Sequence, residues 1–315
     1  MKIKQLGLTL VEVLITLALG AILMTTVVSV YISGLSTNAQ LRESSRLLED
    51  SVFVTSQFTE EFEMAGYFAR LDDYMAATPA AVPDVCSSSW VASVATLEQK
   101  MAVPISGYND VASGFSCQGV TVLAGTDVVV VARRSTEDAV TLDSNTFYLQ
   151  ASPINYVLDS GANASNFDLN DYATGSPLAL GAFLVNIYLV DASDSILKRL
   201  RLEGANFVLE PLVENIEAFE VDYGVDRSND GAPSDTSVGA DDAYVSILAT
   251  VADWQDVTAI QAYVLLRSEE AVAKQTDTRR YFMGKAGYFG PYSDQFKRRL
   301  VVGNVKLTNI AMRRQ

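Results

Sequence analysis

The chain opens with a short basic stretch, and a long apolar run follows it without a single charge. Lys2 and Lys4 precede this run, which extends from Val13 to Ile32. As an α-helix the run rises about 1.5 Å per residue and reaches about 30 Å, the thickness of the hydrocarbon core of a bilayer. The two lysines orient such a helix with its start on the cytoplasmic side. The pattern predicts one membrane-spanning helix with the rest of the chain beyond it.

The spacing of apolar residues indicates that the helix continues past the membrane. Apolar side chains recur three, four and seven residues apart among charged ones, at Leu47, Val54, Phe58, Phe62 and Ala65. Such a stripe is typical of a helix that packs one face on a partner surface. Gly66 suits the C-terminal cap. We expect one helix over residues 8–66, with residues 8–35 in the membrane and residues 36–66 docked on a globular domain.

The following segment has no clear hydrophobic period. Residues 67–118 are rich in Ala, Ser, Pro and Gly, which predicts a long connecting loop. The chain's two cysteines, Cys86 and Cys117, lie in it. A free thiol pair and a redox motif are alternatives to a disulfide. Neither is favoured, because there is no C-x-x-C spacing and no histidine to activate a thiolate. We therefore expect a structural disulfide in an oxidising compartment.

Residues 119–315 are predicted to form strands. Segments rich in Val, Ile, Leu, Phe and Tyr are bounded there by Gly, Asp, Asn and Pro clusters. They cover residues 127–132, 183–190, 198–202, 216–223, 259–267 and 300–307. Within one of them, Glu220 and Asp222 alternate with apolar residues, which predicts an antiparallel strand with one exposed face. The fold class is therefore α+β, a long helix laid across an antiparallel sheet.

Composition argues against several classes of function. The net charge of −15 lacks the basic footprint that nucleic-acid binding needs. The chain contains no histidine, which excludes Ser-His-Asp and Cys-His relays and every zinc site with a histidine ligand. No phosphate-binding loop motif is present, and Gly284, Gly287 and Gly290 have the wrong spacing for a dinucleotide fingerprint. We expect no enzymatic activity.

Two residues of the N-terminal stretch are not explained by a simple membrane anchor. Gly7 ends the basic leader before the apolar run, whereas a secretory leader has its small-residue cleavage site after the run. Glu12 places a carboxylate in the helix, at a cost of about 2.5–3.5 kcal/mol if it reaches the bilayer centre. Together they resemble the class III signal of type IV pilins and type II secretion pseudopilins. The resemblance implies cleavage by a prepilin peptidase between Gly7 and Leu8, followed by N-methylation of Leu8.

Landmarks along the rest of the chain resemble the PilW family of type IV pilus minor pilins. They are Arg46-Leu-Leu48, Met64-Ala-Gly-Tyr67, Val213-Glu-Asn-Ile216, Val221 to Asp226, Asp253-Trp254-Gln-Asp-Val257, Leu265 to Ser268, and Arg298 to Asn309. They run almost the length of the chain, although residues 86–212 carry few of them. The J-type minor pseudopilins of type II secretion are related and usually shorter, so the length favours the pilus.

The resemblance implies a type IV pilin-like fold and a role in assembling the fibre. Such a subunit primes the type IV pilus with other minor pilins, lies at or near its tip, and contributes to adhesion and twitching motility. The implied partners are the other minor pilins, the major pilin, the prepilin peptidase, the inner-membrane assembly platform and a large tip adhesin. The implied location is the inner membrane, with the C-terminal domain in the periplasm, and then the extracellular fibre.

Glu12 is assigned to assembly in this interpretation. A buried carboxylate persists only with a partner or a proton, and no basic residue of the mature chain precedes Arg42. The nearest cation is a terminal amine, and the resemblance points to that of a neighbouring subunit. A secretion pseudopilin is the alternative function. A membrane-anchored extracytoplasmic enzyme or receptor is a second one, for which Trp254 with Asp253 and Asp256 is the cluster to inspect.

One acidic loop matches the first half of a calcium-binding loop. Asp226, Ser228 and Asp230 place oxygen side chains at alternate positions, and a glycine follows at 231. The twelfth position is Ser237 where a bidentate glutamate is needed, although further acids follow at 235, 241 and 242. Because calcium takes six to eight oxygen ligands, a solvated acidic turn is favoured over a calcium site. No other cofactor is expected.

Overall fold

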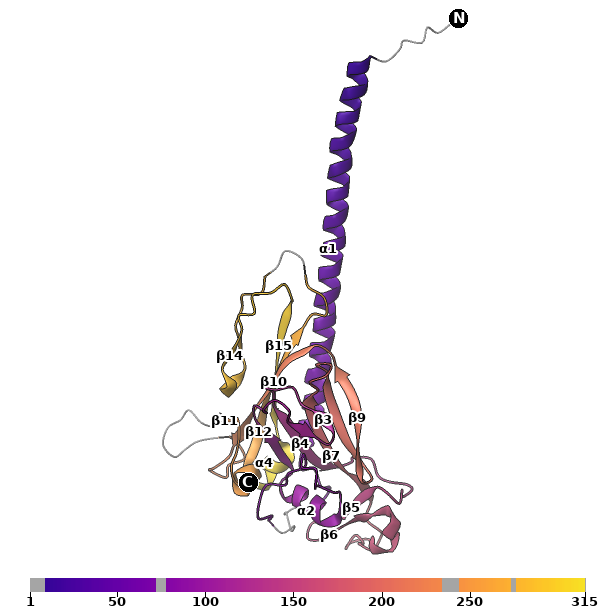
Figure 1. The fold of residues 1–315 in the computed structure, drawn as a ribbon. Helices are drawn as coiled ribbons and strands as arrows, with labels where there is room; N and C mark the ends of the chain where they lie inside the picture. The colour runs from indigo at the N-terminus through magenta and orange to yellow at the C-terminus, as the bar shows by residue number, and fades with distance from the viewer. Residues whose placement is uncertain (1–8, 72–77, 234–243, 273–275, 315) are drawn as a thin grey trace, which may run out of the picture.

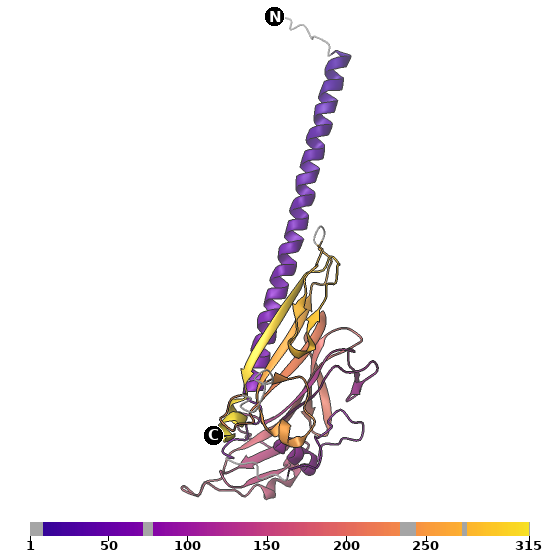
Figure 2. The ribbon, with the colours of Figure 1, turned by 90° about the vertical axis from the view of Figure 1, so that its left-hand side faces the viewer.

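The computed structural model describes residues 9–71, 78–233, 244–272 and 276–314. One long helix extends from a β-rich body, and the N-terminus lies at its far end (Figure 1). Only the second half of the helix runs alongside the body (Figure 2). The predicted fold class, a long N-terminal helix packed on an antiparallel sheet domain, is confirmed.

Helix α1, Leu10–Glu63, is continuous from the apolar run through the amphipathic part. The stripe predicted from residue spacing is the face that docks, and all five of its residues are buried in one core. Phe58 stacks on Phe62, with ring centroids 5.1 Å apart, and meets Tyr188 of the sheet edge-on at 5.7 Å. The docked half of α1 is thus held by an aromatic cluster that joins helix to sheet.

The end of α1 is fixed by the C-terminal segment of the chain. Gly66 has a left-handed backbone (φ 69°), which suits glycine, and its N–H donates to the Ala132 carbonyl at 3.0 Å. Asn309 Nδ2 donates to the Glu63 carbonyl at 2.9 Å, and Arg313 Nη1 donates to the Gly66 carbonyl at 2.9 Å. Asn309 lies in helix α4, and Arg313 lies in the 3-10 turn η3. The bounds are α4 (Thr308–Ala311) and η3 (Met312–Arg314).

A seven-stranded antiparallel sheet forms the end of the body farthest from the N-terminus (Figure 1). Its order is β1-β4-β7-β5-β6, and β7 also pairs with β8, which pairs with β9. The bounds are β1 (Ile105–Tyr108), β4 (Val128–Arg134), β5 (Phe147–Ala151), β6 (Tyr156–Ser160), β7 (Leu180–Val190), β8 (Leu197–Glu203) and β9 (Asn206–Val213). A 3-10 turn, η1 (Gly161–Asn166), follows β6. Strand β4 is buried on both faces: Val129 and Val131 face the α1 core, whereas Val128 and Val130 face a second core.

The segment predicted as a connecting loop contains regular structure. Residues 67–118 include helix α2 (Val94–Ala102), strand β1 on the sheet edge, and β2 (Ser116–Cys117), which pairs with β3 (Val120–Thr121). Ser93 and Thr96 cap α2 reciprocally, and Leu97 and Met101 are buried in the second core. The prediction of a loop was wrong here because the helix is only nine residues long and its apolar face is short.

A second antiparallel sheet, ordered β11-β10-β12-β15, packs beside the docked half of α1. Its strands are β10 (Ile216–Val225), β11 (Tyr244–Val245), β12 (Val257–Arg267) and β15 (Arg298–Lys306), and the short helix α3 (Val251–Gln255) precedes β12. Tyr263 of β12 lies opposite Glu220 on one side and Val302 on the other. The three long strands contain the segments predicted at residues 216–223 and 259–267 and most of the segment at 300–307.

Strand β10 does not have the exposed face that its alternating pattern predicts. Glu220 and Asp222 are each only 4 % exposed. The segment formed by β13 (Tyr281–Phe282), η2 (Gly284–Ala286) and β14 (Tyr288–Phe289) packs on this face of β10 beside Ala218, and Asp222 accepts the N–H of Lys285 at 3.0 Å. The pattern was misleading because a later segment of the chain packs on the polar face of the strand.

Candidate functional site

The helix start that carries Glu12 has a capping box. The Glu12 N–H donates to Thr9 Oγ1 at 3.3 Å, and Glu12 Oε2 accepts from the Thr9 N–H at 3.3 Å and from its hydroxyl at 3.2 Å. Thr9 is thus the N-cap of α1, and Glu12 is its third residue. Sequence reasoning missed this use of Glu12, although the T-x-x-E pattern signals it. Gly7 and Leu8, the predicted cleavage and methylation residues, lie outside the described residues.

The first half of α1 presents apolar side chains to its surroundings on every side. Its most apolar window has a mean hydropathy of 2.4, and none of that window is buried against the body. Leu10 is 77 % exposed, and Val30 is 68 % exposed. A helix that is apolar all round is stable in lipid or inside a helical assembly. Length and composition make α1 a candidate membrane span.

Glu12 is the one charged residue in this exposed half. Oε2 takes both capping bonds, whereas Oε1 has no hydrogen bond and no ion pair among the described residues. The first basic residue after it is Arg42, about 45 Å farther along the helix at 1.5 Å per residue. No cation within the described part of α1 can therefore reach the carboxylate.

Ion pairs lock the docked half of α1 to the body at both ends. Near the bottom of α1, Glu61 accepts from Arg133 Nε at 3.1 Å and from Asn186 Nδ2 at 2.6 Å. Near the top, Arg46 pairs with Glu214 at 2.7 Å and with Glu269. The body therefore follows the helix as one unit.

The predicted pairing of the two cysteines is present in the structure. Cys86 and Cys117 form a disulfide that closes a loop of 31 residues in sequence separation. Cys117 is fully buried, and both cysteines belong to the second core. The bond fixes the end of β2 to the segment that leads into α2. A loop of this length stabilises the folded state by about 3–4 kcal/mol.

In the acidic loop that begins at Asp226, the first carboxylate is hydrogen-bonded to the backbone of the loop. Asp226 is fully buried and accepts the N–H groups of Ser228 at 3.1 Å, Asp230 at 3.3 Å and Gly231 at 2.9 Å. Burial acts to raise the pKa of Asp226, but these bonds outweigh it and lower the pKa. Among the described residues no three acids, cysteines or histidines are grouped to hold a metal ion. Residues 235, 241 and 242 lie outside the described ranges.

Calcium binding at this loop stays a prediction that a thermal melt can test. If the carboxylates at 226, 230, 235, 241 and 242 converge on an ion, the melting temperature should be higher in millimolar calcium than in the presence of a chelator. The geometry of Asp226 instead favours an unchanged midpoint. Asp230→Asn is the matched variant, and it should abolish any calcium-dependent rise.

Trp254 belongs to the core, and it also forms part of the wall of a cavity of about 280 Å³ that Asp253 and Asp256 do not line. Its side chain is 1 % exposed, its Nε1 donates to the Leu248 carbonyl at 3.1 Å, and its ring meets Tyr223 edge-on at 4.6 Å. Asp253 bonds the Thr250 hydroxyl at 2.6 Å and helps to start α3. The interpretation of Trp254, Asp253 and Asp256 as a receptor or catalytic cluster gains no support from this geometry.

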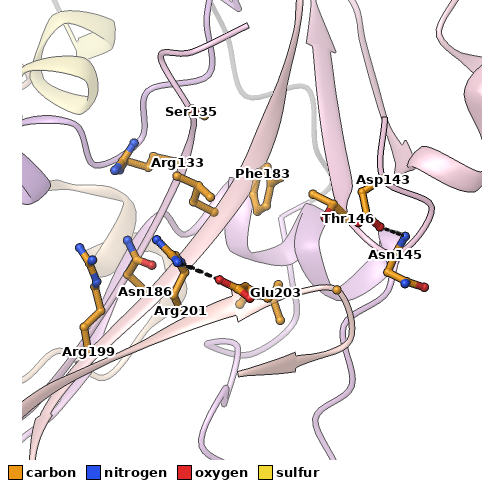
Figure 3. A pocket seen from close by; sticks show the side chains of 13 residues that line it. Arg133, Ser135, Asp143, Asn145, Thr146, Phe183, Asn186, Arg199, Arg201 and Glu203 are labelled. Carbon is orange, nitrogen blue, oxygen red and sulfur yellow. Dashed lines mark hydrogen bonds and ion pairs between the residues drawn. The ribbon is translucent and has the colours of Figure 1, made fainter. Parts of the chain in front are cut away.

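A polar cavity of about 510 Å³ lies on the seven-stranded sheet (Figure 3). Three arginines line it, and each has a glutamate partner: Arg133 bonds Glu61, Arg199 pairs with Glu210 at 2.5 Å, and Arg201 pairs with Glu203 at 2.8 Å. The first pair joins β4 to α1, the second joins β8 to β9, and the third lies within β8. The arginines that line the cavity therefore have a structural role.

The N-terminal helix and the docked sheet have the arrangement of a type IV pilin-like fold. An apolar N-terminal helix with a lone acid near its start carries an antiparallel β-domain on its second half. Residues 2–28 match the model described as the prokaryotic N-terminal methylation motif.

Residues 187–309 match the family model described as Type IV Pilus-assembly protein W. With the methylation motif, this match supports a type IV pilus minor pilin of the PilW family, a structural and not an enzymatic class. The chain matches no protein among the curated ones compared with it. Among solved structures it is similar to a type IV-like pilin from Thermus thermophilus, with 13 % identity, a TM-score of 0.38, and coverage of 84 % of this chain and 97 % of that chain.

Proposed function

We propose that this protein is a minor pilin that primes type IV pilus assembly and is incorporated at or near the fibre tip with other minor pilins. A prepilin peptidase cuts between Gly7 and Leu8. Before assembly, the mature subunit resides in the inner membrane with its body in the periplasm. Its partners are the other minor pilins, the major pilin, the assembly platform and a large adhesin at the tip. The match to the PilW family model supports this assignment.

The observation that carries the proposal is Glu12 on a fully exposed apolar helix. Undirected apolar packing between two such helices leaves their axial register open, because sliding by a turn costs little. A single buried charge pair sets the register, since a misplaced charge in apolar surroundings is costly. Oε1 of Glu12 is open to a donor. The terminal amine of Leu8 in a neighbouring subunit is the cation that can reach the same axial position in a bundle of parallel helices. The carboxylate therefore guides the incoming helix into place.

The capping box gives Glu12 a second role, and three variants separate the two. Glu12→Ala removes both cap and charge. Glu12→Gln removes the charge, yet glutamine also serves at this position of a capping box. Thr9→Ala removes the cap partner and leaves the charge. Each is produced at normal abundance in the native host, and surface fibres are counted while other minor pilins are co-purified.

We expect Glu12→Ala and Glu12→Gln to lose partner association and most piliation, and Thr9→Ala to keep most of both. Cleavage and folding of the body should be normal in all three. If Glu12→Gln assembled like the wild type while Glu12→Ala and Thr9→Ala failed, the residue would act as a helix cap. Wild-type fibre numbers in all three would remove Glu12 from the assembly mechanism.

A further inference from the structure

Strand β9 forms an edge of the seven-stranded sheet and pairs only with β8 among the described strands. Figure 1 shows it at the margin of the body. Natural proteins guard edge strands with charges or a covering element, because free N–H and C=O groups invite another strand. The edge strand β15 carries three cations and packs on α1. By contrast, the one charged residue of β9 is Glu210, which is already paired with Arg199 and Arg201.

The register of the β8–β9 hairpin shows which backbone groups of β9 are free. Glu203 and Asn206 pair across a two-residue turn, so they exchange both of their hydrogen bonds. Because bonding alternates along the strand, the outward N–H and C=O groups are those of Phe207 and Leu209, followed by the carbonyl of Pro211. Proline at an outward position is typical of an edge strand. No backbone group of the described residues bonds the N–H of Phe207 or Leu209.

The side chains along this edge are apolar on both faces of the sheet. Val208 and Leu209 point to opposite faces, and each is 41 % exposed. Phe207 is half-buried, and its ring packs on that of Trp90 with centroids 5.6 Å apart. A row of alternating donors and acceptors is matched by an extended backbone, and the exposed side chains beside it require apolar neighbours on the added strand.

Strand β9 runs toward the membrane end of α1. Near its start it is separated by one strand from Asn186, which bonds Glu61 near the end of α1. Directly after it, Glu214 pairs with Arg46, about 22 Å nearer the membrane along the helix. A second copy anchored in the same membrane presents its own β9 in the same direction, and parallel pairing is less stable per residue. A strand from a different protein that runs away from the membrane fits better.

We propose that the free edge of β9 binds an extended segment of a neighbouring minor pilin, which joins the sheet as an antiparallel strand. Its backbone pairs with the outward groups of Phe207, Leu209 and Pro211, and its apolar side chains cover Val208 and Leu209. The added strand fixes the orientation of one body against the next. The inference rests on the proposed function, which supplies the neighbouring pilin.

Hydrogen exchange of the full mature chain in detergent, alone and co-purified with the other minor pilins, tests the edge. Exchange is resolved to single amides by fragmentation in the mass spectrometer. We expect the amides of Phe207 and Leu209 to exchange at least about tenfold more slowly in the complex. The amides of Val208 and Glu210 already bond β8, so their exchange should change much less.

A matched pair of substitutions separates the backbone bond from the side chain. Leu209→Pro removes the outward N–H and keeps the ladder to β8, as Pro211 does two residues farther on. It should weaken association with the other minor pilins about tenfold or more, because a carbonyl of the added strand loses its donor. Leu209→Val resembles proline in size and keeps the N–H. It should stay within about fourfold of the wild type, the effect of one buried CH₂ group.

Unchanged exchange at Phe207 and Leu209 in a complex that forms would overturn the inference. Equal weakening by Leu209→Pro and Leu209→Val would also overturn it, since the contact would then depend on the side chain. Dimers of the chain alone that Leu209→Pro dissociates would assign the edge to a second copy. Should Leu209→Pro fail to fold in a thermal melt, the exchange of the wild type decides. Absence of any complex would count against the proposed function as well, so the two failures are distinguishable.

Discussion

Glu61→Ala is expected to destabilise the body by up to about 3–5 kcal/mol, because it leaves the partly buried cation of Arg133 without its partner. The Glu61 carboxylate is 5 % exposed and takes both arms of Arg133, which is itself 16 % exposed. The Glu61 carboxylate also accepts a hydrogen bond from the side-chain amide of Asn186. Its removal therefore leaves two donors, Arg133 and Asn186, without their acceptor between α1 and the sheet. Urea unfolding of the full chain in detergent measures the change.

A paired replacement distinguishes a broken ion pair from lost packing. Glu61→Met with Arg133→Met removes both charges and keeps most of the volume, and such swaps are near neutral or stabilising. We expect the double variant to be more stable than Glu61→Ala by at least about 2 kcal/mol. A double variant no more stable than the single one would mean that the charges contribute little to docking of the helix.

Glu220→Gln is expected to stabilise the protein at pH 8 and to have little effect at pH 5. Burial raises the pKa of Glu220 to about 9, and the charges of Asp127, Asp110 and Asp222 add to the rise. The folded state therefore holds a proton that the unfolded chain, with an ordinary pKa near 4.5, releases. The stability linked to this proton is complete below pH 4.5 and is lost as the pH rises toward 9.

Glutamine binds no proton, so the variant should avoid this loss and gain about 1–3 kcal/mol over the wild type at pH 8. Asp127, whose pKa burial raises to about 7, still contributes a decline between pH 4 and 7 in both proteins. Thermal melts from pH 5 to 9 measure the difference, and Glu137→Gln on an exposed loop is the control. A parallel pH profile for Glu220→Gln and the wild type would show that Glu220 is ionised in the fold.

Features that depend on local pattern were predicted well from the sequence. The buried stripe on α1 follows from helical spacing alone, because any partner surface must cover the same face. The strands β4, β7, β10 and β12 are rich in β-branched and aromatic residues, and the disulfide follows from two cysteines that lack C-x-x-C spacing. The membrane-length segment required only the absence of charge between Glu12 and Arg42.

Features that depend on distant parts of the chain were not predicted. The burial of Asp222 involves the 281–289 segment, which packs over β10 and which no pattern within β10 reveals. Lys100 on α2 is fully buried, and burial lowers its pKa to about 7, with Ser106 Oγ as its partner at 2.8 Å. The pairing of Glu61 with Arg133 joins residues 72 positions apart. Each of these polar groups is buried by tertiary contacts.

The proposed function depends on a pilin-type N-terminus, and the mass of the mature protein shows whether that N-terminus is formed. The basic stretch is short and ends at Gly7, ahead of the apolar run, so we expect the cut to fall before the apolar run and to leave that run in the mature chain. Intact mass and N-terminal sequencing of protein from the native membrane are the measurements. We expect a chain of residues 8–315 that carries one methyl group on Leu8. A mature chain that begins at Met1, or one cut beyond Ile32, would contradict it.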